Sequence, residues 1–344
     1  MPIEKVGRRQ TYTLNTLPGM LLITLRHFPT LLIYFAFLFT SIFASFCVTA
    51  EDELLSQQEV VKALNNLVVS VDKDYLHEKH REKITEQITT SLNQGDFDGH
   101  YQFHRFKRKL ESLLYASSHD ANFEITWRSG SESLTNAPDR VFPSTIETQL
   151  LESNIGYLGI DGDLFNEHAK SDVDNAVAYL SSATAIVIDL RSAGYVDLDV
   201  AKQFLSYFVP TGKPLATLTL AQNNTSLLVA SDTGFKMGEK VPIFVVTSPF
   251  VAGSWEFVAY TLQQTSKATV VGTRTMGLSY LSATTPLSEH INLVMTYGDL
   301  RHPSTQESWK DEGVIPDIPC EATDAVTAAF ELVEKRLSSE TKGK

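Results

Sequence analysis

The fold is decided by residues 241–280, which read VPIFVVTSPFVAGSWEFVAYTLQQTSKATVVGTRTMGLSY. Val241–Ser248 is an apolar, β-branched run of strand length, and Pro249 ends it. Four apolar residues then recur at helical spacing: Trp255, Val258, Ala259 and Leu262. Ala268–Gly272 is a second short apolar run. A strand–turn–helix–strand unit of this kind predicts a parallel sheet, and its turn places free backbone N–H groups at a helix N-terminus, which suits a nucleophile and an oxyanion.

The composition indicates a folded, globular chain. Of its 344 residues 43% are hydrophobic, and the formal net charge is -12. A negative charge of this size disfavours nucleic acid and anionic membrane surfaces as partners. The two cysteines, Cys47 and Cys320, form no CxxC motif, and Cys47 lies in a segment expected to be removed on export, so we expect no structural disulfide. We also expect no metal site and no cofactor.

The N-terminal 50 residues have the pattern of a signal peptide or an N-terminal membrane anchor. Leu31–Phe46 is uncharged, basic residues precede it, and Val48-Thr49-Ala50 resembles a cleavage site. We expect export to the periplasm or the extracellular space, with anchoring by residues 31–50 as the alternative. Any contact with a membrane is expected only through this segment, and Met20 offers a second start that shortens its basic region.

Two further regions follow, at residues 51–127 and 128–340. The first shows helical spacing of apolar residues, and its basic run at residues 104–109, HRFKRK, is expected on a solvent-facing helix surface. The second contains the expected α/β core. Its strands are expected at Asn154–Asp161, Ala185–Leu190, Leu215–Leu220 and Leu227–Ala230, and its further helices at about Leu198–Phe208 and Asp324–Leu337.

Several motifs resemble the tail-specific (C-terminal processing) serine peptidases, most closely the branch that includes the interphotoreceptor retinoid-binding protein. They are the turn and helix of residues 247–272, the DLR sequence at residues 189–191, and RHPSTQESWKDEGVIPD at residues 301–317. The resemblance implies a helical N-terminal region followed by a ClpP/crotonase-like spiral ββα core. Fewer than 30 residues separate Trp127 from Ile155, so we expect no PDZ domain at that point.

The resemblance also places the family's catalytic positions on this chain. The nucleophile position falls on Gly253, the histidine base on Asn122, the lysine base on Leu278 and the orienting glutamate on Lys310. None of these residues supplies the expected chemistry, since an amide and an alkyl chain cannot take a proton from a hydroxyl. Gly194 keeps the first glycine of the oxyanion turn, where a glycine with positive φ is expected.

Ser254 follows the nucleophile position by one residue, and we expect it to cap the helix by accepting the N–H of Glu256 or Phe257. The favoured hypothesis is an exported, catalytically impaired peptidase homologue that retains a cleft for a peptide, an unfolded protein segment or an apolar small molecule. The first alternative is an active serine hydrolase with Ser254 as a displaced nucleophile, served by His119 or another histidine. The second alternative is a structural or scaffolding domain.

Overall fold

The computed structural model describes residues 53–128, 145–164, 167–238 and 240–342. Leu54–Lys344 forms one compact unit. The predicted signal or anchor segment lies outside the described residues, and so does Cys47. None of the helices within these ranges is long and apolar enough to cross a membrane.

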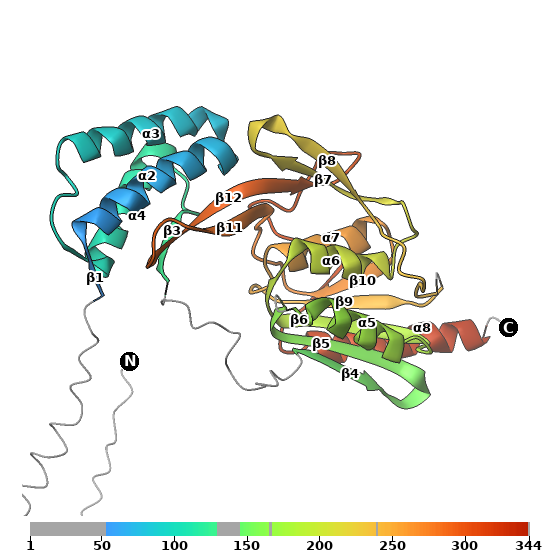
Figure 1. The fold of residues 1–344 in the computed structure, drawn as a ribbon. Helices are drawn as coiled ribbons and strands as arrows, with labels where there is room; N and C mark the ends of the chain where they lie inside the picture. Colours follow the sequence, from blue (N-terminus) through green and yellow to red (C-terminus); the bar gives the residue numbers. More distant parts are fainter. Residues whose placement is uncertain (1–52, 129–144, 165–166, 239, 343–344) are drawn as a thin grey trace, which may run out of the picture. The chain divides into compact units, whose positions relative to one another are not determined.

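A six-stranded sheet forms the centre of the core (Figure 1). Its order is β13 (Ile318–Pro319), β10 (Ala268–Gly272), β9 (Ile243–Thr247), β6 (Ala185–Val196), β5 (Ile155–Leu164) and β4 (Ile146–Leu150). Neighbouring strands are parallel, except that β4 runs antiparallel to β5. The predicted parallel pairing of the two strands in residues 241–280 is confirmed, with Val245 opposite Val270.

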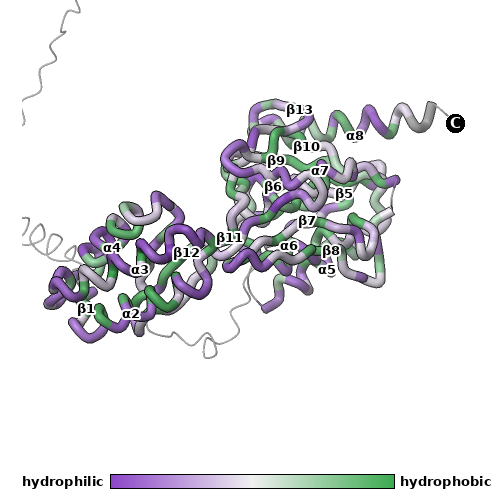
Figure 2. Tube along the Cα trace, turned by 90° about the horizontal axis from the view of Figure 1, so that it is seen from above, coloured by the Kyte–Doolittle hydropathy of each residue, from purple (hydrophilic) through white to green (hydrophobic). Residues whose placement is uncertain are grey.

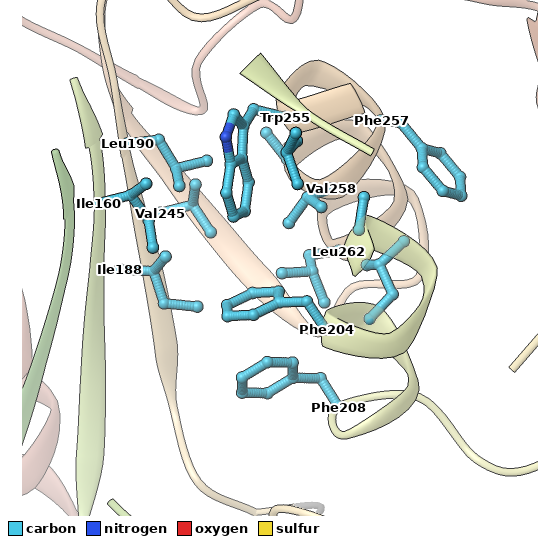
Figure 3. Close-up of a cluster of buried hydrophobic side chains, with 14 of the residues drawn as sticks. Ile160, Ile188, Leu190, Phe204, Phe208, Val245, Trp255, Phe257, Val258 and Leu262 are labelled. Atoms are coloured by element: carbon cyan, nitrogen blue, oxygen red, sulfur yellow. The ribbon is translucent and has the colours of Figure 1, made fainter. Parts of the chain in front are cut away.

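Helices cover both faces of this sheet. One face packs against α5 (Ala169–Tyr179), α6 (Leu198–Ser206) and α7 (Ser254–Gln264), and the other against α8 (Ala325–Lys342). Alternate residues of β6 point to the two sides, so Ile188 packs with the first group and Val187 with α8. Figure 3 shows Trp255 of α7 next to the sheet residues Leu190 and Val245, with Val258 and Phe204 in the same buried cluster. Burial of Trp255 fixes the start of α7 against the sheet.

A second, antiparallel sheet is formed by strands that lie between and after those of the first sheet along the chain. Its order is β11 (Tyr280–Pro286), β12 (Ile291–Arg301), β7 (Pro214–Leu220) and β8 (Thr225–Val229), and β3 (Glu124–Trp127) also pairs with β12. Short 3₁₀ turns lie at η2 (Glu152–Asn154) and η3 (Ala221–Asn223). The predicted strands at Leu215–Leu220 and Leu227–Ala230 correspond to β7 and β8, which pair as a hairpin, whereas β4, β11, β12 and α5 had no sequence prediction.

The helical region consists of α2 (Gln57–Asp74), α3 (Glu78–Asn93) and α4 (Phe103–Ser118), with β1 (Leu54–Leu55) and β2 (Tyr101–Gln102) paired beside them. Its core includes Leu64, Phe106 and, from β12, Leu293. Figure 2 shows hydrophobic and hydrophilic residues interleaved along α2 and α4, as expected for helices with one buried face. The basic residues of α4 lie mostly on its exposed side, as predicted.

The prediction of fold class is therefore confirmed: N-terminal helices are followed by an α/β core. The division at residue 127 stays a prediction.

Candidate functional site

The turn between β9 and α7 carries Gly253, the residue on which the resemblance places the nucleophile position. Gly253 is the N-cap of α7, with φ 57° and ψ -122°, a conformation that strains residues with a side chain. A β-carbon built on it meets no atom within 4 Å. A side chain at position 253 would therefore stand in open space at the start of α7, and glycine supplies none.

Ser254 is the first residue of α7 and is only 9% exposed. It does not cap the helix, because Gly253 is the N-cap and the N–H of Phe257 donates to the carbonyl oxygen of Gly253 at 3.1 Å. The prediction of a capping role for Ser254 is thus wrong: the residue already belongs to the helix and lies one position past the cap. Among the described residues, no hydrogen-bond partner of the Ser254 hydroxyl is found.

Glu256 is the most densely bonded side chain of the turn. Its carboxylate is fully buried, with 0% exposure. Oε2 accepts the N–H of Gly253 at 3.0 Å and the N–H of Leu278 at 2.7 Å. Oε1 accepts the N–H of Gly277 at 2.6 Å and the hydroxyl of Thr275 at 2.5 Å. Four donors thus compensate the burial of this charge, and they tie the turn before α7 to the loop after β10.

The loop at residues 275–278 is held in turn by the C-terminal motif. Thr275 Oγ1 accepts the N–H of Val314 at 2.7 Å, and the N–H of Asp311 donates to the carbonyl oxygen of Gly277 at 2.9 Å. Gly313 has φ 71°, and a β-carbon on it would overlap the carbonyl of Thr275. The motif residue Gly313 therefore has a structural reason to be glycine.

Neither position predicted for a lysine base and an orienting glutamate has those properties. Leu278 contributes its N–H to Glu256, and its alkyl side chain is 41% exposed. The ammonium group of Lys310 lies 4.6 Å from the centre of the Tyr280 ring and 3.9 Å from Asp311 Oδ2. A hydrogen bond with Tyr280 raises the pKa of Lys310, so this side chain carries a positive charge at the position predicted for an orienting carboxylate.

Asn122 and His119 lie in the segment that follows α4. Both the backbone N–H and the side-chain amide of Asn122 donate to Asp120 Oδ1, at 2.9 and 2.8 Å. His119 is exposed and adopts a left-handed conformation as the C-cap of α4, with its N–H bonded to the carbonyl oxygen of Tyr115 at 2.7 Å. No hydrogen bond joins either residue to Ser254 within the described ranges.

Ser248 is a second serine of the turn, and its contacts are structural. Its hydroxyl donates to the carbonyl oxygen of Arg191 at 3.0 Å and accepts the N–H of Phe250 at 3.2 Å. Arg191 forms an ion pair with Asp189, at 2.8 Å between Nη2 and Oδ2, and also donates to the carbonyl oxygen of Ala322 at 2.8 Å. These contacts join Arg191, within β6, to Ser248 just after β9 and to Ala322 before α8.

The expected oxyanion turn is not formed. β6 continues to Val196 and stays paired with β5, so Gly194 is a strand residue without positive φ, which corrects the prediction of a turn glycine. Gly194 is glycine because a β-carbon would meet the backbone of Gly162 and the carboxylate of Asp163. The N–H of Tyr195 donates to Asp163 Oδ1 at 2.6 Å. The N–H of Tyr195 is therefore already occupied by a carboxylate, whose negative charge would oppose the binding of an oxyanion beside it.

Three large apolar side chains are exposed on the two loops that contain Gly253 and Leu278. Phe250 is 76% exposed and Met276 48%, and the third is Leu278. The N–H of Met276 donates to the carbonyl oxygen of Val251 at 3.0 Å, so the two loops lie against each other. An exposed apolar group of this kind is typical of a surface that binds a ligand or a partner.

Sequence reasoning missed two residues of this site, Glu256 as the link between the loops and Asp163 as the acceptor for Tyr195. A glutamate at the third position of a helix is a signal for the first, since it can reach back to the N-cap N–H. No local pattern signals the second, because the two residues meet only through the pairing of β5 and β6.

Comparisons with known proteins agree with this architecture. The sequence model of the family described as "Peptidase family S41" matches residues 154–320. A curated relative, the chloroplastic "Carboxyl-terminal-processing peptidase 3" of Arabidopsis thaliana, is 28% identical over 183 residues. That match covers 51% of this chain but only 34% of the relative's length.

Two solved structures share the fold. A lipoprotein from Streptococcus agalactiae superimposes with a TM-score of 0.60 at 13% identity, covering 81% of this chain and 97% of that one. A photosystem II D1 C-terminal processing protease gives a TM-score of 0.57 at 13% identity, covering 77% and 93%. At such identities the likeness concerns the fold alone.

Proposed function

Since residues 154–320 of this chain belong to peptidase family S41, we propose that the protein is a catalytically impaired homologue that keeps a cleft for peptides or apolar ligands. The observation that carries the proposal is Gly253: the family's nucleophile position faces open space and has no side chain. A serine peptidase without its nucleophile and base retains only binding and oxyanion stabilisation, a loss of order 10⁴ or more in rate.

Two further observations support impairment over a displaced nucleophile. Ser254 is buried and lies one helical position, about 100° and 1.5 Å, from the family's position. Attack geometry tolerates only about an ångström of misplacement. Asp163 also engages the Tyr195 N–H in the region where the family has its oxyanion turn.

Retention of a binding cleft is supported by the exposed apolar side chains of Phe250, Met276 and Leu278 beside Gly253. The family implies peptide substrates, and an extended peptide with apolar side chains fits such a surface. We also propose that the chain belongs to the branch related to the interphotoreceptor retinoid-binding protein and that it lacks a PDZ domain. Export is proposed as well, with residues 1–50 serving as a signal peptide or an anchor.

The test measures the binding of two probes and the cleavage of one of them. Fluorescein-labelled casein and a fluorescent fatty acid are titrated with the protein, and casein is followed for cleavage. Binding without turnover is expected. Phe250→Ser combined with Leu278→Ser should weaken binding of the probes about tenfold or more, because both changes remove apolar side-chain area from the binding surface. The matched control is Leu227→Ser, since Leu227 is 53% exposed on β8. Efficient casein cleavage by the wild type, or no binding of either probe, would overturn the proposal.

A further inference from the structure

We propose that the outer edge of β8 binds a second copy of this chain, through antiparallel pairing of the two β8 strands about a two-fold axis at Leu227. β8 (Thr225–Val229) is the last strand of the second sheet (Figure 1). Among the described residues it pairs with β7 alone, so its other side carries no strand. An edge of this kind presents a row of N–H and C=O groups with which another chain can pair.

The pairing of β8 with β7 determines which of its backbone groups face this edge. The N–H of Leu220 in β7 donates to the carbonyl oxygen of Asn224 at 2.8 Å. Along an antiparallel pair, successive residues of one strand alternate between bonding to the partner strand and pointing away from it. Even-numbered residues from 224 onward therefore bond toward β7, and the N–H and C=O groups point to the outer edge at residues 225, 227 and 229.

These three positions are complementary to themselves. When Leu227 lies opposite Leu227 of a second copy, Thr225 lies opposite Val229 of that copy, and Val229 opposite its Thr225. Each of these pairs can exchange two N–H···O bonds, so every outward group of β8 finds a partner. A strand of another protein could meet the same bonds, but here one surface supplies both halves of a closed, symmetric contact.

The side chains fit the same register. Leu228 packs against the main core cluster, so Leu227 points to the opposite, solvent side of the sheet, where it is 53% exposed. Residues directly opposite in an antiparallel pair project from the same face, and the two copies of Leu227 would thus cover each other. Pairing removes an exposed apolar side chain from water in both copies.

Charge also favours this edge as the place where two copies meet. Each chain has a formal net charge of -12, so two copies repel one another in general. Residues 214–231, which form the whole β7–β8 hairpin, contain no charged side chain, although 20% of the chain is charged. Like charges directly opposite each other destabilise strand pairs, and pairing through β8 creates none.

The other sheet edges within the described ranges carry features that oppose pairing. β13 spans only two residues and contains Pro319. β4 carries the charge of Glu147, and β11 has an irregular register and ends at Pro286. Short length, charge, proline and bulges are the means by which proteins protect an edge strand. β8 has neither a charge nor a proline, which distinguishes it from these three.

The test cross-links two copies at single positions. In the full chain with Cys47→Ser and Cys320→Ser, a cysteine is introduced by Leu227→Cys and treated with a short bis-methanethiosulfonate reagent, which bridges thiols a few ångströms apart. Opposed residues have Cα atoms about 5.5 Å apart, so we expect a covalent dimer. The matched control is Thr225→Cys on the same edge, because its two copies would lie about 14 Å apart along the strands and should cross-link at least roughly tenfold more slowly. A mixture of Thr225→Cys and Val229→Cys chains should cross-link again.

Sedimentation equilibrium provides a second measurement. A contact of five residues buries less area than a standard interface, so the association should be weak. Leu227→Lys should weaken it roughly tenfold or more, since it replaces an apolar contact by two like charges, whereas Val69→Lys, at a residue 64% exposed on α2, should not. Cross-linking of Leu227→Cys no faster than that of Thr225→Cys, or self-association that Leu227→Lys leaves unchanged, would overturn the inference. The contact includes neither Phe250 nor Leu278, so its failure is distinct from a failure of the proposed ligand surface.

Discussion

Replacing Glu256 by glutamine should destabilise the protein more than any other single carboxylate-to-amide change in the candidate site. The carboxamide can keep the two donors on Oε1, Thr275 and Gly277, through its one oxygen. Its NH₂ group would then face the N–H groups of Gly253 and Leu278 and leave both without an acceptor. A buried unsatisfied donor costs about 1–3 kcal/mol, so Glu256→Gln should lower the free energy of unfolding by roughly 2–6 kcal/mol.

Urea unfolding followed by circular dichroism measures this change, with Glu312→Gln as the exposed control that should stay within about 0.5 kcal/mol. The corresponding fall in Tm is roughly 5–15 °C for a unit of this size. A loss of less than about 1 kcal/mol in Glu256→Gln would refute the reasoning. It would mean that the four hydrogen bonds contribute little beyond the bonds that the same groups make to water in the unfolded chain.

Three other outcomes are expected. Gly253→Ser alone should not restore casein cleavage, because Asn122 and Leu278 supply no base, and a general base is worth roughly 10²–10⁴-fold; efficient cleavage by this variant would show that the base lies elsewhere. Burial and the hydrogen bond to Asp174 raise the pKa of Tyr207 to about 12, so the wild type should lose stability as the pH rises from about 10 to about 12, and Tyr207→Phe should lose less in urea titrations over that range. N-terminal sequencing of the exported protein should begin at Glu51, after Ala50; an intact Met1 or Met20 in the membrane fraction would instead indicate an anchor.

The central strand–turn–helix–strand unit was predictable because its signals are local. The β-branched run before Pro249, the helical spacing that starts at Trp255 and the short run Ala268–Gly272 each report one element. The buried strand β6 was also recognised, but its end was not. Its residues 191–196 look like a turn in isolation and become a strand only by pairing with β5.

The candidate site was predictable only in part, because its residues act through contacts distant in sequence. The absence of a nucleophile side chain at Gly253 follows from the sequence once the family's segment is aligned. The roles of Glu256 and Asp163 do not, since their partners Leu278 and Tyr195 lie 22 and 32 residues away along the chain. The capping role predicted for Ser254 failed for a related reason: a one-residue difference in where α7 begins changes which residue is the cap.

The most direct test of the central claim is active-site labelling of the wild type and Ser254→Ala with a fluorophosphonate probe. This reagent reacts with serines that a neighbouring base has activated. Because the proposal places the nucleophile position on Gly253, and because Ser254 is buried, we expect no labelling of either protein. Stoichiometric labelling of the wild type that disappears in Ser254→Ala would contradict the account and identify Ser254 as the nucleophile of a working hydrolase.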